Sequence, residues 1–81
     1  MTVIEEVKAS IAEIIAKKLL VSLEAVTVNA RLVEDLGADS LNILEIVLDI
    51  NEAFEIELPI DGVAGIRNVA DLHYLVAQEV R

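Results

Sequence analysis

Aliphatic side chains recur every three or four residues in three separate stretches of this 81-residue chain. This spacing places them on one face of an α-helix, and it predicts helices over residues 3–19, 40–55 and 69–80. No stretch alternates apolar and polar residues as a half-buried strand does. Pro59 stops the second helix, and the glycines after it leave room for only a short helical turn. The sequence therefore predicts an all-α bundle of three principal helices and one short helix.

A capping residue stands at the start of each principal helix. Thr2, with Glu5 three residues later, fits a capping box. Ser40 and Asn68 have side chains that can accept a hydrogen bond from a first helical turn, and Asp71 is favourable in the first turn of the last helix. These residues predict where the helices begin, and they make Ser40 the expected N-cap of the second helix.

Residues 20–37 form a long loop between the first and second helices. We expect Val26, Leu32 and Leu36 to anchor this loop and Gly37 to end it. Ordered loops of this length are uncommon in small domains and often carry function.

Because the chain is too short for a second core, residues 1–81 are expected to form a single domain.

Acidic residues dominate the middle of the chain. The formal net charge is −9, and between Leu32 and Ile66 there are nine acids and no Lys or Arg. A surface of this kind repels nucleic acid and favours cationic partners. A solvated face that keeps the protein soluble is the simpler alternative.

Other features narrow the class of protein. The chain has no cysteine, so disulfides and thiolate sites are excluded. No apolar run approaches the roughly 18 residues of a membrane span, and the first residues do not resemble a signal peptide. We therefore expect a cytoplasmic monomer that interacts with neither membrane nor nucleic acid.

The second predicted helix has two apolar faces. One face is an ordinary core face that carries Ile43, Ile46, Val47, Ile50 and Phe54. The other is a leucine ridge formed by Leu41, Leu44 and Leu48, and the acids Glu45, Asp49, Glu52 and Glu55 surround it. A bundle this small has one core, so the ridge is expected to be exposed and to dock a partner, with apolar anchors for affinity and carboxylates for steering. Scattered surface leucines, which are common, are the alternative.

Ser40 lacks the surroundings of a catalytic serine. Ala38 and Asn42 stand where a nucleophile elbow has glycines, and the single histidine, His73, lies on another predicted helix. Asp35 and Asp39, which precede Ser40, do not fit a calcium-binding loop, because Ser40 would occupy the position of the mid-loop glycine. Neither a catalytic nor a metal site is expected. Ser40 is then either a plain N-cap or an attachment point for a phosphate group, which a helix N-terminus favours.

Residues 34–41 read Glu-Asp-Leu-Gly-Ala-Asp-Ser-Leu, and Glu-Ile-Val follows at 45–47. This string, in an acidic chain of this length, closely resembles the bacterial acyl carrier protein family. The resemblance continues through residues 54–59 and 69–72. It implies that a transferase attaches 4′-phosphopantetheine from coenzyme A to Ser40 in a magnesium-dependent reaction, and that the terminal thiol of the group carries acyl chains as thioesters.

The resemblance, together with the leucine ridge and its surrounding acids, predicts which residues bind partners and which hold the acyl chain. The expected partner-binding residues are Asp39, Leu41, Leu44, Glu45, Leu48, Asp49 and Glu52. The expected acyl-chain pocket consists of Ile46, Ile50, Phe54 and Ile66.

The expected function is that of a discrete carrier, which presents acyl intermediates to enzymes and catalyses nothing itself. Its expected partners are a phosphopantetheinyl transferase and acyl synthases, reductases and transferases with basic docking patches. Asn42, Asp49 and Asn51 depart from the common fatty-acid type, which leaves fatty-acid, polyketide and related pathways open. The alternative function is an acidic interaction adaptor that uses the leucine ridge and has Ser40 only as a cap.

Overall fold

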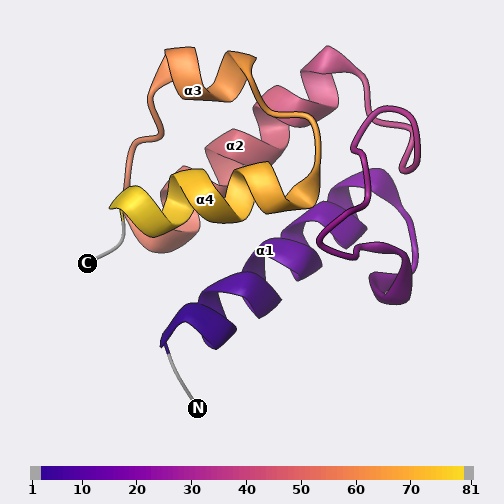
Figure 1. Ribbon diagram of the computed structural model, residues 1–81, viewed down its shortest axis with the longest axis horizontal. Helices are drawn as coiled ribbons and strands as arrows, with labels where there is room; N and C mark the ends of the chain where they lie inside the picture. The colour runs from indigo at the N-terminus through magenta and orange to yellow at the C-terminus, as the bar shows by residue number, and fades with distance from the viewer. Residues whose placement is uncertain (1–2, 80–81) are drawn as a thin grey trace.

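The computed structural model describes residues 3–79 and consists of helices joined by ordered loops (Figure 1). Its elements are α1 (Val3–Leu19), a 3₁₀ turn η1 (Leu23–Ala25), α2 (Ser40–Phe54), α3 (Ile60–Ala64) and α4 (Val69–Glu79). Within residues 3–79 the extended pairing is limited to one isolated bridge between Arg31 and Asn68. The predicted all-α bundle of three principal helices and one short helix is confirmed.

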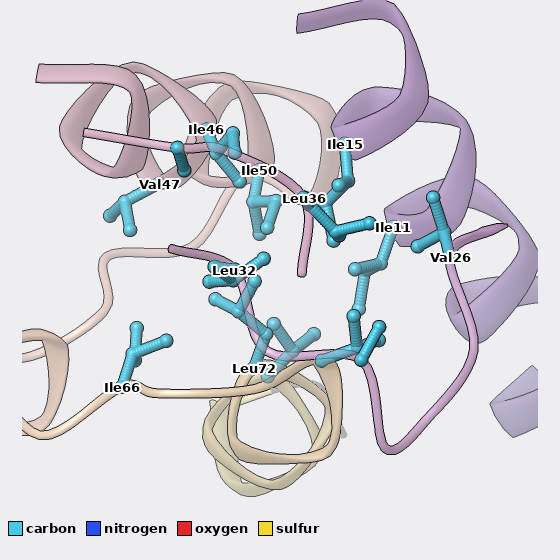
Figure 2. Packing of buried hydrophobic residues seen from close by; sticks show 14 of the residues in the cluster. Ile11, Ile15, Val26, Leu32, Leu36, Ile46, Val47, Ile50, Ile66 and Leu72 are labelled. Carbon is cyan, nitrogen blue, oxygen red and sulfur yellow. The ribbon is translucent and has the colours of Figure 1, made fainter. Parts of the chain in front are cut away.

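The three principal helices surround one aliphatic core. α1 packs against both α2 and α4, and the long loop lies at one end of the bundle, at the right of Figure 1. Fully buried side chains come from each of the three principal helices and from the loop: Ile11, Ile15, Leu32, Ile46, Ile50, Val69, Leu72 and Val76. In Figure 2 the Leu32 side chain lies between those of α2 and α4. Burying one such side chain stabilises the fold by about 1.5–3 kcal/mol.

The long loop is ordered, as predicted, because apolar anchors and backbone hydrogen bonds hold it. Val26, Leu32 and Leu36 are buried. The Leu32 N–H donates to the Arg67 carbonyl at 2.9 Å, and the Val69 N–H donates to a carbonyl of the loop at 3.0 Å. These bonds fasten the loop to Arg67, which precedes α4, and to Val69, the first residue of α4.

Two helices end in the left-handed conformation without a glycine. Leu20 follows α1 with φ 56°, and Glu55 follows α2 with φ 55°. The next N–H in each case reaches back across the last turn, from Val21 to the Ala16 carbonyl at 3.1 Å and from Ile56 to the Asn51 carbonyl at 3.0 Å. This is the Schellman arrangement, which satisfies carbonyls at the helix end.

The start of α2 differs from the prediction by one residue. Asp39, and not Ser40, is the N-cap: its carboxylate accepts the Asn42 N–H at 2.8 Å, and the Asn42 side-chain oxygen accepts the Asp39 N–H at 3.1 Å. With Ser40 as the cap, the reciprocal position would fall on Ile43, which has no side-chain acceptor. Asp39 therefore caps the helix, and Ser40 becomes its first residue.

The cap of α4 is confirmed. The Asn68 side chain accepts the Asp71 N–H at 3.0 Å, and the Asp71 carboxylate accepts the Asn68 N–H at 3.2 Å. Thr2, the predicted cap of α1, lies outside the described residues.

Candidate functional site

A tight turn before α2 presents Ser40 at the surface. Leu36 and Ala38 are buried, and the Ala38 N–H donates to the Leu32 carbonyl at 2.8 Å, so the chain is fixed two residues before Ser40. Gly37 between them has φ +76°, a conformation that glycine adopts without strain. Ser40 itself is exposed.

An ion pair braces the turn that leads to Ser40. The Arg31 side chain donates to both carboxylate oxygens of Asp35 at 3.2 Å, and the Arg31 backbone N–H donates to the same group at 2.8 Å. The side-chain hydrogen bond from Arg31, followed by the backbone bond, holds the pKa of Asp35 below its usual value. Arg31 thus offsets one of the negative charges that precede the serine.

Within residues 3–79 no base contacts the Ser40 hydroxyl. Among the described residues its hydroxyl makes no hydrogen bond, and the neighbouring Asp39 carboxylate is engaged in capping. His73 belongs to α4 and makes no hydrogen bond with Ser40 in the described structure. Its pKa is lowered mainly by burial and to a smaller extent by the charge of Lys8 on α1. An exposed, unactivated hydroxyl is suited to receive a group from another protein's active site.

The two faces of α2 are confirmed. Ile46, Val47 and Ile50 are buried, and Ile43 and Phe54 pack against the core. The leucine ridge lies in solvent, with Leu41, Leu44 and Leu48 exposed to 61%, 50% and 56%. Asp49 and Glu52 are exposed and Glu45 is half-buried. One contact was missed from the sequence: Lys18 of α1 pairs with Asp49 at 3.2 Å.

An open groove lies beside the ridge, between α2 and the α3 region. Its apolar residues include Val47, Leu58 and Val63, and acids stand at its edge. The Asn51 side chain fixes one wall by accepting the Leu58 N–H at 3.1 Å. None of the four residues predicted for an acyl-chain pocket lines this groove. Three of them, Ile46, Ile50 and Ile66, are buried in the core, and Phe54 is half-buried.

Two further properties of the described residues concern metal binding and membrane insertion. Within residues 3–79 no group of three or more histidine or acidic side chains could hold a metal ion. In the same range no helix has the length and apolar character needed to cross a membrane.

Comparison with known proteins defines the class. A family model described as a phosphopantetheine attachment site matches residues 9–73, which include the exposed serine and all of α2. The fold and this match define a carrier that bears a phosphopantetheine group. An acyl carrier protein of Syntrophobacter fumaroxidans is 41% identical over 71 residues, 88% of each chain. One of Clostridium perfringens is 40% identical over 60 residues, which cover 74% of this chain and 79% of the relative.

A solved structure agrees with the sequence relatives. A putative acyl carrier protein from Mycobacterium tuberculosis matches with a TM-score of 0.84 and 28% identity, over 89% of this chain and 96% of its own. This chain belongs to the acyl carrier protein family. It is a carrier of acyl groups on 4′-phosphopantetheine, and the adaptor without a prosthetic group is not favoured.

Proposed function

We propose that Ser40 is the attachment point of 4′-phosphopantetheine and that enzymes dock on α2 beside it. The observation that carries the attachment is the exposed hydroxyl of Ser40, free of hydrogen bonds within residues 3–79, at the first position of α2. A helix N-terminus favours a negatively charged phosphodiester, so the group fits this place. When bound, it supplies a thiol that holds acyl groups as thioesters.

Asp39 and Ser40 have separate tasks in this proposal. Asp39 caps α2, so the Ser40 oxygen can bond to phosphorus without loss of the cap. As that bond forms, the diphosphate bond of coenzyme A breaks and adenosine 3′,5′-bisphosphate leaves. The hydroxyl proton passes to a base of the phosphopantetheinyl transferase, because no base of the described chain contacts Ser40.

The leucine ridge and the acids Glu45 and Glu52 would receive the transferase and, later, acyl synthases, reductases and transferases with basic patches. Charge complementarity supports this surface: the segment from residue 32 to 66 carries nine acids and no Lys or Arg. Carboxylates around apolar anchors steer a cationic partner to the site. The chain itself catalyses nothing in this proposal, and tethering raises the local concentration of the acyl group at each enzyme.

We further propose that the apolar groove beside α2 admits the acyl chain toward the predicted pocket. Val47 and Leu58 line the groove and belong to the same buried cluster as Ile46, Ile50 and Ile66. An acyl chain that enters there would reach those side chains after a small shift of α3.

The cytoplasm remains the expected compartment of the protein.

Loading with coenzyme A and a phosphopantetheinyl transferase tests the attachment, with intact mass as the measurement. The wild-type chain should gain one phosphopantetheine, and Ser40→Ala should gain none. Ser22→Ala is the matched control, because Ser22 is also exposed and also stands at the start of a helical turn. A loaded Ser40→Ala protein, or an unloaded Ser22→Ala protein, would contradict the assignment.

A further inference from the structure

The acidic face of α2 holds one positive charge that comes from another helix. Lys18 of α1 lies 3.2 Å from the Asp49 carboxylate, and the two side chains are 29% and 47% exposed. A shallow groove between the helices is lined by Lys17 and Lys18 on one side and by Asp49 and Glu52 on the other. The α1 edge of the acidic face is therefore of mixed charge.

This ion pair has little weight in the stability of the fold, since a partly exposed pair contributes about 0–1 kcal/mol. Its effect falls on a docking partner. A cation that approaches Asp49 also approaches the Lys18 ammonium, which already pairs with one of the two carboxylate oxygens, and the two cations compete for the carboxylate. When docking removes water, the repulsion between the two cations becomes stronger.

We propose that Lys18 is a specificity-determining residue for docking on α2: it occupies Asp49 and thereby selects partners without a cation at the α1 edge. This inference rests on the proposed docking surface. Partner cations bind Glu45, which has no ion pair within residues 3–79 and does not line the groove with Lys17 and Lys18. Glu52 lines that groove but is not paired with a lysine in the described residues. At the α1 edge a neutral or acidic partner group fits best, because it also meets Lys17.

A double-mutant cycle in the full-length chain tests the proposal. The measured quantity is the dissociation constant for a phosphopantetheinyl transferase whose basic docking patch extends over the α1 edge, the kind of partner that Lys18 should disfavour. Lys18→Gln should tighten binding about two- to fivefold, the range of a single exposed charge interaction. Asp49→Asn should weaken binding more in the Lys18→Gln background than in the wild type, because only there is Asp49 free to contact a partner cation.

Lys8→Gln is the matched control. It makes the same change in net charge on the same helix, but Lys8 acts on His73 of α4 and makes no ion pair with an acid of α2 within residues 3–79. It should change the dissociation constant much less than Lys18→Gln does. Equal effects of the two lysine variants, or an Asp49→Asn loss that is the same in both backgrounds, would overturn the inference.

Glu45→Gln separates this inference from the docking proposal. It should weaken binding in every background. If Glu45→Gln and Leu44→Ala both leave binding unchanged, the docking surface itself is wrong and the role of Lys18 fails with it. If they weaken binding and Lys18→Gln behaves like Lys8→Gln, the docking surface stands and only the role of Lys18 fails.

Discussion

At the start of α2, two adjacent polar residues differ in what they do for the fold. The Asp39 carboxylate bonds to the Asn42 N–H, whereas the Ser40 hydroxyl has no such bond within residues 3–79. We therefore expect Asp39→Ala to lower the free energy of unfolding by about 0.5–2 kcal/mol, the usual loss for an N-cap. Ser40→Ala should change it by less than about 0.5 kcal/mol, as at other exposed sites.

Urea unfolding of both variants measures this difference. A Ser40→Ala loss as large as that of Asp39→Ala would show that the hydroxyl is the cap after all.

His73 gives the fold a pH dependence of its own below neutral pH. Its Nε2 atom is buried without a hydrogen-bond partner, and burial, then Lys8, lowers its pKa below the usual 6.5. The folded state therefore favours the neutral ring. As the pH falls below 6.5, His73 binds a proton in the unfolded chain before it does so in the folded chain. The stability that the neutral ring contributes therefore decreases with falling pH, and the decrease ends once the pH is below the pKa of His73 in the folded state.

The free energies of unfolding of the wild type and of His73→Gln at pH 7.5 and 5.5 measure this contribution. The advantage of the wild type over the variant should shrink at the lower pH. The acidic side chains are the same in both proteins, so their contribution cancels in the comparison. An advantage that is unchanged or grows at pH 5.5 would contradict the burial argument.

Among the elements, α2 links the fold to the site through its two faces. Ile50 is fully buried, so Ile50→Ala should lower the free energy of unfolding by about 2–5 kcal/mol. Leu44 is 50% exposed, so Leu44→Ala should lower it by no more than about 0.5 kcal/mol. The same Leu44 variant should weaken transferase binding by about 1 kcal/mol or more if the leucine is a well-packed anchor.

Thermal unfolding beside binding measurements for each variant checks both expectations. If Leu44→Ala destabilises the bundle as much as Ile50→Ala does, the leucine ridge belongs to the core, and the partner must bind another surface.

The helices and both faces of α2 could be predicted because helical spacing is a local property of the sequence. The long loop was predicted from the absence of that spacing, and its anchors from their apolar character. The cap of α2 was misplaced because Asp39 and Ser40 are both good caps, and only the reciprocal bond with Asn42 decides between them.

Contacts between distant parts of the chain could not be predicted. Lys18 and Asp49 stand on different helices, and their pairing depends on how α1 crosses α2. The bond from Leu58 to Asn51 likewise depends on how the chain turns back after α2. The groove that Asn51 helps to form was therefore missed. Three of the predicted pocket residues, Ile46, Ile50 and Phe54, lie on the core face of α2, and the fourth, Ile66, follows α3.

For the whole molecule, the distribution of charge matters more than any single pair. The ion pairs between side chains described in residues 3–79 are Lys18–Asp49 and Arg31–Asp35, which leave most acids of the middle segment without a basic partner. The molecule is only 19 Å across its shortest axis, about twice the screening length of about 8–10 Å at physiological salt. Repulsion among these acids therefore acts across much of the fold.

We expect the melting temperature to rise when salt is added from low ionic strength, and to rise further with millimolar magnesium. Glu57 and Asp61 are exposed at the edge of the groove, and the double variant Glu57→Gln, Asp61→Asn should melt higher at low salt and respond less to added salt. Melting temperatures that do not change with salt in either protein would mean that the acids act independently.

The backbone bonds that join the long loop to the start of α4 have a consequence for the timing of modification in the cell. The loop that leads to Ser40 bonds to Arg67, Val69 and Ala70, almost thirty residues beyond the serine in the sequence. A ribosome makes these residues well after Ser40 itself, so a nascent chain lacks the partners that order the turn. We therefore expect loading to begin only after synthesis has passed the start of α4, and a chain cut before Arg67 to be a poor substrate although it contains Ser40 and all of α2.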